Sequence, residues 1–207
     1  MVCVLCYNIR NSTGWRGGSH RKEKHIMKVY IARHGQTDWN IQRRAQGRSD
    51  IPLNETGRAQ AKNLHDNIKD IQFTAVYASP LKRAAETAQI ATDGKYNIIY
   101  DDRLVERSFG GFEGKKINNW AQDTGYDIGD LKLNTNVGNI EPVKDVLART
   151  KAFLDDLKDR HSDKDVVLVV AHGQVSRGLH HNLVGYTDDT DWWSVEYGNA
   201  EAREYRL

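Results

Sequence analysis

Two short apolar runs, each ending in a His-Gly pair, constrain the fold of this chain more than any other feature. Residues 29–32 (Val-Tyr-Ile-Ala) lead into Arg33 and His34, and residues 165–170 (Asp-Val-Val-Leu-Val-Val) lead into Ala171 and His172. Runs rich in β-branched residues are typical of strands buried on both faces of a parallel sheet. Ligands of α/β proteins bind at the carboxyl ends of such strands. We therefore expect both histidines at the ligand-binding edge of a parallel sheet.

The rest of the chain alternates between strand and helix patterns. We expect further strands at residues 75–78, 97–100, 192–197 and 202–207, and helices that begin at Asn54, near Pro80, at Pro142 and after Gly173. The helix after Pro142 carries apolar residues at the 3.6-residue period with charges opposite, so it should cover the sheet. Together these patterns predict a three-layer α/β/α sandwich with a mainly parallel central sheet.

Residues 115–141 interrupt this alternation and read as an irregular, partly helical insertion. Long loops over a site are usually lids or specificity elements. The segment holds Lys115, Lys116 and Lys132 but no arginine.

The first 26 residues differ in composition from the remainder, so we predict a flexible N-terminal extension (1–26) followed by one domain (27–207). The extension contains five basic residues against one acidic residue, whereas the whole chain has 30 basic and 28 acidic residues. The domain itself is therefore slightly acidic. Without a basic stripe it gives no reason to expect nucleic-acid binding.

A zinc site is the alternative reading of the N-terminal segment. Cys3, Cys6, His20 and His25 fit the loose spacing of a Cys₂His₂ site. Such a site needs a helix that carries its histidines, and the Gly17-Gly18 pair opposes a helix there. We therefore predict no metal and no cofactor.

The sequence also predicts where the protein resides. No apolar run approaches the 18 residues of a membrane span, and the segment from Val2 to Tyr7 is too short for a signal-peptide core. We expect a cytoplasmic protein that binds no membrane. A homo-oligomer remains open.

Arg33 and His34 place a permanent cation beside a titratable nucleophile at a strand end. Cationic groups at such a position suit an anionic substrate, of which phosphate is the commonest. A small phosphorylated metabolite is therefore the expected partner.

Four segments in this order resemble the signature of the histidine phosphatase superfamily. They are residues 33–37 (Arg-His-Gly-Gln-Thr), 79–88 (Ser-Pro-Leu-Lys-Arg-Ala-Ala-Glu-Thr-Ala), 104–110 (Leu-Val-Glu-Arg-Ser-Phe-Gly) and 171–173 (Ala-His-Gly). With their intervals they cover residues 27 to 207. The family includes cofactor-dependent phosphoglycerate mutases and phosphatases similar to them, so the resemblance implies a phosphoglycerate mutase-like fold.

The resemblance implies five catalytic residues. His34 would be the nucleophile that becomes a phosphohistidine, and Glu106 the general acid and base. Arg33, Arg83 and His172 would donate hydrogen bonds to the phosphoryl oxygens.

Structural readings compete with two of these roles. Arg83 could instead form a surface ion pair with Glu86, and Glu106 could pair with Arg103 or Arg107. Glu113 is an alternative acid.

Substrate-binding residues follow from the same resemblance. In the family, the positions of Thr37, Asn40, Gln46 and Gly47 lie around the bound phosphate, and we assign Arg33, Arg83, Glu106 and Gly173 to the same set. Side-chain amides and backbone N–H groups at a turn are suitable donors to phosphate oxygens.

The sequence favours a phosphatase over its alternatives. Mutases of this family hold a second phosphate or carboxylate with an arginine pair in the insertion, and residues 115–141 lack arginine. A catalytically silent binding module on the same fold is the alternative from another class, but all five catalytic residue types are present. Which phosphomonoester is hydrolysed cannot be read from these patterns.

Overall fold

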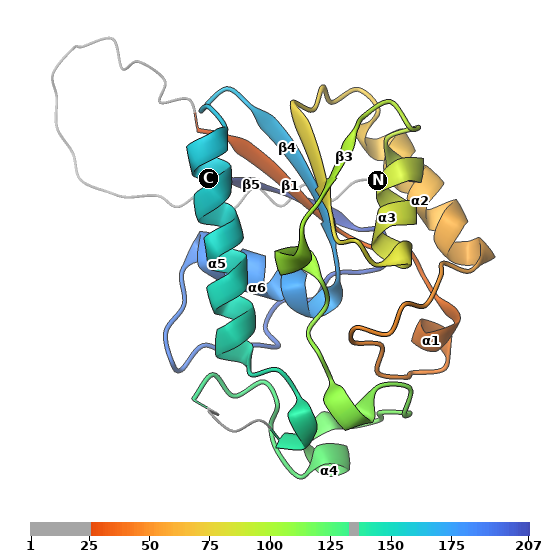
Figure 1. The fold of residues 1–207 in the computed structure, drawn as a ribbon, viewed down its shortest axis with the longest axis vertical. Coiled ribbons are helices and arrows are strands. Elements are labelled where there is room, and N and C mark those ends of the chain that lie inside the picture. Colours follow the sequence, from red (N-terminus) through yellow and green to blue (C-terminus); the bar gives the residue numbers. More distant parts are fainter. Residues whose placement is uncertain (1–25, 133–136) are drawn as a thin grey trace, which may run out of the picture.

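A five-stranded sheet with the order β3-β2-β4-β1-β5 forms the centre of the protein. The computed structural model describes residues 26–132 and 137–207 (Figure 1). The strands are β1 (Lys28–Arg33), β2 (Ala75–Ala78), β3 (Ile98–Tyr100), β4 (Val166–Ala171) and β5 (Ala202–Arg206). All neighbouring pairs are parallel except β1 with β5. As predicted, β3 is an edge strand and β4 is central.

The helices connect these strands and flank the sheet. They are α1 (Asp38–Ile41), α2 (Glu55–Ile68), α3 (Lys82–Ala91), α4 (Trp120–Thr124), α5 (Val143–Arg160) and α6 (Gly173–Val184), with short 3₁₀ turns at Asp102–Leu104, Gly110–Phe112 and Val137–Asn139.

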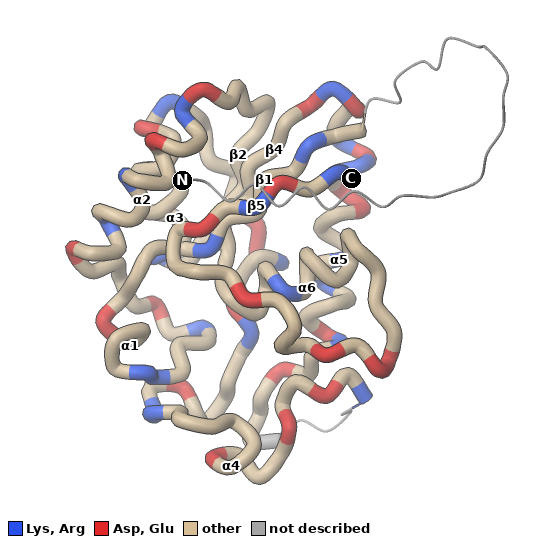
Figure 2. Tube along the Cα trace, turned by 180° about the vertical axis from the view of Figure 1, so that it is seen from behind, with Lys and Arg blue, Asp and Glu red and all other residues tan. Residues whose placement is uncertain are grey.

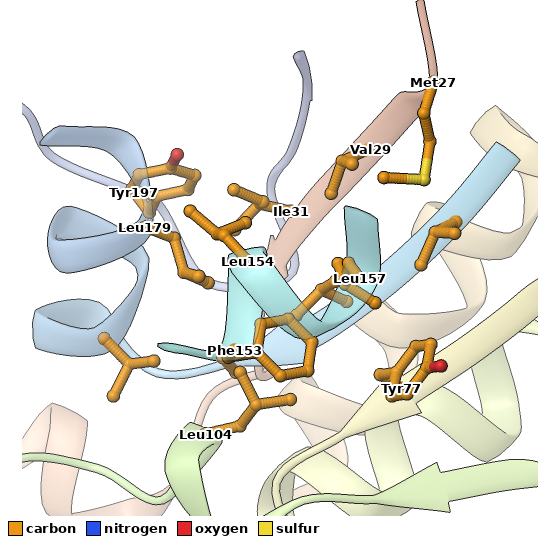
Figure 3. Packing of buried hydrophobic residues seen from close by; sticks show 14 of the residues in the cluster. Met27, Val29, Ile31, Tyr77, Leu104, Phe153, Leu154, Leu157, Leu179 and Tyr197 are labelled. Atoms are coloured by element: carbon orange, nitrogen blue, oxygen red, sulfur yellow. The ribbon is translucent and has the colours of Figure 1, made fainter. Parts of the chain in front are cut away.

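The alternation of side chains along the strands builds two cores. Val29 and Ile31 of β1 point toward α5 and α6, where Phe153, Leu154 and Leu179 pack against them (Figure 3). On the other face, Ala32, Val76, Leu168 and Val170 pack against the apolar sides of α2 and α3. Because helices cover both faces of one mainly parallel sheet, the predicted three-layer sandwich is confirmed.

The strand predicted at residues 192–197 is wrong. Residues 192–194 form a turn, and residues 195–197 belong to no strand of the sheet. Arginine side chains bind the carbonyl groups that a strand would have offered to a neighbour. Arg177 Nε donates to Val195 O at 2.7 Å, Arg203 donates to Glu196 O, and Arg33 donates to Tyr197 O at 2.7 Å.

The insertion shares a small core with Ala45 and Phe109, which lie outside it. Ala45, Phe109, Ile128 and Ile140 are buried together, and Trp120 of α4 stacks on Phe109 with ring centroids 4.5 Å apart. An irregular, partly helical segment was predicted here, and α4 with the 3₁₀ turn at Val137–Asn139 matches it.

Several predictions lie outside what the structure describes. The N-terminal extension and the alternative zinc ligands Cys3, Cys6, His20 and His25 fall in residues 1–25 and stay untested. Within residues 26–132 and 137–207, no helix combines the length and apolarity that crossing a membrane requires. Basic and acidic positions are interspersed along this part of the chain (Figure 2). That the protein binds no nucleic acid stays a prediction.

Gly57 and Gly35 pack backbone against backbone, which ties α2 to the loop that follows β1. A Cβ on Gly57 would lie 2.1 Å from Gln36 O, and one on Gly35 would lie 2.4 Å from Gly57 O. Alanine favours a helix over glycine by about 1 kcal/mol. We nevertheless expect Gly57→Ala to lower the free energy of unfolding by about 1–3 kcal/mol, because the backbone must move apart.

Urea denaturation measures this loss. The control is Gly111→Ala, since among the described residues a Cβ at Gly111 meets only Gly138 O, at 3.9 Å. If Gly57→Ala were as stable as the wild type, this close approach would not exist in solution.

Candidate active site

The pairing of β1 with β4 brings the two predicted histidines together. Arg33 is in register with Ala171, so the residues after them, His34 and His172, leave the sheet at the same edge. His34 N donates to Ala171 O at 3.0 Å, and the two imidazole rings have centroids 5.1 Å apart. Both histidines are buried.

The backbone around His34 fixes the ring and its tautomer. Nδ1 lies 2.6 Å from Gly35 O, and a carbonyl oxygen can only accept, so Nδ1 carries the proton of the neutral ring. The lone pair is therefore on Nε2. His34 O accepts hydrogen bonds from Asn199 Nδ2 at 3.1 Å and from Ala200 N at 3.2 Å.

Backbone carbonyls hold Arg83 in the first turn of α3. Its Nη1 donates to Ser49 O and its Nη2 to Gly47 O, each at 2.8 Å, and the residue is fully buried. The predicted alternative, an ion pair with Glu86, is wrong, because Glu86 binds Arg58 Nε at 2.6 Å instead.

Three buried nitrogen atoms around this edge have no partner in the described part of the chain. They are Arg33 Nε, Arg83 Nε and His172 Nδ1. The opposite nitrogen of His172, Nε2, lies 2.8 Å from Ser79 Oγ. When the Ser79 hydroxyl donates to Nε2, Nδ1 carries the proton of the neutral ring and is a donor. An unsatisfied buried donor costs about 1–3 kcal/mol, so three of them together are suited to an anion that accepts from all three.

Glu106 lies against the first turn of α6. Its Oε1 accepts from the backbone N–H of Arg107 at 2.9 Å and of Val175 at 3.3 Å, and its Oε2 accepts from Gln174 N at 3.3 Å. Gly173 separates it from Arg33, since a Cβ on Gly173 would lie 3.9 Å from Glu106 Oε2 and 3.7 Å from Arg33 Nε. The carboxylate thus faces the same edge of the sheet as the two histidines.

Neither arginine proposed as a structural partner pairs with Glu106. Arg103 binds Asp101 and Asp156, each at 2.7 Å. Arg107 is buried and donates from its guanidinium to Ile128 O at 2.7 Å and Glu141 O at 2.6 Å. Both ion-pair alternatives for Glu106 are therefore wrong.

The predicted substrate-binding residues lie on the loop after β1, and two of them cap α1. Thr37 and Asn40 form a capping box in which Asn40 Oδ1 accepts from Thr37 N at 2.9 Å. Gln46 is buried and its Oε1 has no partner in residues 26–132 or 137–207. Gly47 contributes a carbonyl to Arg83. Whether these residues contact a substrate stays a prediction.

Glu113 is not available as an alternative acid. Its carboxylate accepts hydrogen bonds from Arg48 N at 3.0 Å, Ser49 N at 3.0 Å, Ser49 Oγ at 2.7 Å and Phe109 N at 3.2 Å. The donors on Arg48 and Ser49 hold the Glu113 carboxylate against the loop that precedes α2.

Burial and positive charge keep both histidines neutral. Desolvation, with smaller contributions from the charges of Arg83 and Arg33, holds the pKa of His34 well below its usual value. Desolvation also lowers the pKa of His172 well below that value, with Arg83 again the next contribution. Burial lowers the pKa of Arg83 to about 10, so its guanidinium stays charged at neutral pH.

We expect neither histidine to take up a proton as the pH falls from 7.5 to 6. Since the folded pKa lies below the unfolded value of about 6.5, the neutral ring persists below pH 6.5. The unfolded chain binds the proton first, so these groups make the free energy of unfolding fall as the pH drops through that value. Histidine-ring NMR, assigned with His34→Ala and His172→Ala, measures both midpoints. A midpoint at or above about 6.5 for either ring contradicts the burial described here.

Sequence patterns missed two residues that hold the histidines. Ser79 follows β2 and binds His172, and Asn199 precedes β5 and binds the backbone of His34. Ser79 could have been found, because it follows the β2 run as His172 follows the β4 run, and the carboxyl ends of parallel strands lie at one edge of the sheet. Asn199 sits in a turn with no distinguishing pattern.

The comparisons with known proteins identify the family that this chain matches. The sequence profile of the histidine phosphatase superfamily (branch 1) matches residues 29–207. An uncharacterized phosphatase, PhoE, of Bacillus subtilis strain 168 is 33% identical over 176 residues, which cover 84% of this chain and 86% of PhoE. Phosphoglycerate mutase-like protein 4 of Arabidopsis thaliana is 32% identical over 160 residues, which cover 74% of this chain and 69% of that protein.

Solved structures show the same fold. A mycobacterial glucosyl-3-phosphoglycerate phosphatase, determined in complex with VO3, superimposes with a TM-score of 0.76 and is 26% identical, covering 86% of this chain and 91% of that one.

Proposed function

The chain belongs to branch 1 of the histidine phosphatase superfamily, and from that premise we propose that it is a phosphatase that hydrolyses small phosphomonoesters through a phosphohistidine on His34. The observation that carries this proposal is the set of unpartnered buried donors on Arg33, Arg83 and His172, which flank a neutral His34 with its lone pair on Nε2.

In the first step, Nε2 of His34 attacks phosphorus in line with the ester oxygen. The P–O bond to the leaving group breaks as the N–P bond forms. Arg33 Nε, Arg83 Nε and His172 Nδ1 donate to the equatorial oxygens, where charge must be stabilised in the transition state. Glu106 gives its proton to the leaving alcohol.

In the second step, the roles of Glu106 reverse. As a carboxylate it takes a proton from water, and the water oxygen attacks phosphorus while the bond to His34 Nε2 breaks. Inorganic phosphate leaves, and His34 is again neutral, with its Nδ1–H donating to Gly35 O. Neither step uses a metal or a cofactor.

A mutase is the second candidate, because relatives with both kinds of name resemble this chain. The insertion has no arginine to hold a second anionic group. Two of its three lysines are also engaged: Lys132 binds Asp189 at 2.6 Å, and Lys115 lies 5.0 Å from the centre of the Phe112 ring. These contacts support hydrolysis over isomerisation.

The substrate we propose is a small phosphorylated metabolite of the cytoplasm. The test incubates the protein with EDTA and a panel of phosphomonoesters that includes 3-phosphoglycerate, and follows released phosphate and isomerised product together. Phosphate release that survives EDTA supports the phosphatase. Isomerised product with little phosphate favours the mutase, and neither product would favour a binding module that has kept the fold.

A further inference from the structure

The loop that holds Arg83 is joined to the base of the insertion by backbone hydrogen bonds. Gly114 N donates to Ala45 O at 2.8 Å, Ala45 N to Lys115 O at 3.0 Å, and Ile117 N to Arg43 O at 2.9 Å. Residues 43–49 and 113–117 therefore form one unit. Glu113 is the acidic residue inside this unit.

The carboxylate of Glu113 accepts hydrogen bonds from the loop at residues 48 and 49. Oε1 accepts from Arg48 N and Phe109 N, and Oε2 accepts from the backbone and the hydroxyl of Ser49. Every group that faces it is a donor, which suits an acceptor-only carboxylate and not an amide.

The same short loop holds Arg83 with its carbonyls. Gly47 O and Ser49 O accept from the guanidinium, while the N–H groups of Arg48 and Ser49 donate to Glu113. Ser49 thus binds both residues, and the peptide group between Gly47 and Arg48 binds Arg83 through its carbonyl and Glu113 through its N–H. Burial lowers the pKa of Arg83, and the charge of Glu113 is among those that oppose this shift.

Gly47 shows how closely Glu113 lies against the loop. Its φ is +52°, a conformation that favours glycine, and a Cβ there would lie 2.1 Å from Glu113 Oε1. A larger residue at position 47 would displace the carboxylate. The loop conformation and the position of Glu113 are therefore coupled.

We infer that Glu113 is a positioning residue that acts through Arg83: it fixes the carbonyls of Gly47 and Ser49, and these carbonyls aim Arg83 Nε at the phosphoryl group. The inference rests on the proposed function. Glu113 lies at the base of the insertion, so one side chain fixes both the start of the insertion and the loop that holds Arg83.

Glu113→Gln tests this role at nearly constant volume. The new NH₂ group must face either the N–H groups of Arg48 and Phe109 or the N–H and hydroxyl of Ser49, so at least one backbone N–H loses its acceptor. A displacement of about 1 Å in a positioning group can cost about 10²-fold in rate, so we expect kcat/KM to fall by about 10- to 100-fold. The affinity of Glu113→Gln for orthovanadate, measured by calorimetry, should also be lower than that of the wild type.

A double-mutant cycle with Arg83→Gln separates positioning from a general structural defect. If Glu113 acts through Arg83, Glu113→Gln should change kcat/KM by less than about threefold once Arg83 is already Gln, because the two losses are coupled. Equal fold losses in both backgrounds would overturn the inference. Ser49→Ala removes one donor to Glu113, and we expect it to give a smaller loss in the wild-type background and none with Arg83→Gln.

Two further measurements keep the outcomes distinct. Asp123→Asn is the matched control, since this carboxylate also accepts from two consecutive backbone N–H groups, those of Asn118 and Asn119. It should leave kcat/KM unchanged. If the wild type hydrolyses nothing, the proposed function fails, and orthovanadate affinity in the same cycle still decides whether Glu113 acts through Arg83.

Discussion

His34→Ala is expected to lower phosphate release by about 10⁴-fold or more, because alanine cannot form the phosphohistidine intermediate. The ring is buried and neutral, and the hydrogen bond from Nδ1 to Gly35 O fixes its orientation. The first measurement is phosphate release with an excess of phosphomonoester. The second uses a phosphomonoester with a labelled phosphoryl group and a rapid quench in base, and it follows the acid-labile label that stays on the protein. Wild-type protein should carry the label, and His34→Ala should carry none.

A matched control separates loss of the nucleophile from loss of the fold. His65→Ala removes a histidine of α2 whose Nδ1 bonds to Ala91 O at 3.0 Å, and it should keep full activity. His34→Ala should also keep the cooperative unfolding of the wild type, since alanine leaves the backbone bonds of residue 34 intact. Label that persists in His34→Ala would mean that a different residue receives the phosphoryl group.

The sequence could predict the layers and the histidines because both depend on local pattern. Residues 166–170 are apolar without interruption, which is typical of a strand covered on both faces, and this predicted the central position of β4. His34 and His172 followed from the ends of two such runs. The three-layer order then needed only the amphipathic helices.

What sequence patterns could not predict are bonds between side chains and distant backbone. The segment at 192–197 has the alternation of a strand, yet Arg33, Arg177 and Arg203 take its carbonyls. Glu113 was predicted as an alternative acid because the sequence does not distinguish a free carboxylate from one that accepts several hydrogen bonds. Such bonds depend on the tertiary arrangement, so no periodicity reports them.

Glu106→Gln is expected to lower kcat/KM for an alkyl phosphate by about 10²–10⁴-fold, because the leaving alkoxide then departs without a proton. Gln has nearly the same shape, and its carbonyl oxygen can still accept from the N–H of Arg107 or Val175. The matched control is Glu86→Gln, which alters an exposed ion pair with Arg58 and should leave the rate unchanged.

The choice of leaving group makes this prediction specific to acid catalysis. With 4-nitrophenyl phosphate the phenolate leaves without a proton, so Glu106→Gln should phosphorylate His34 far faster than with the alkyl ester. Hydrolysis of the phosphohistidine still lacks its base, so the variant should show a burst of nitrophenolate equal to the enzyme concentration and then a slow steady rate. Stopped-flow absorbance measures both phases. An equal loss for the two substrates, without a burst, would remove Glu106 as the proton donor and leave it a residue that only anchors the start of α6.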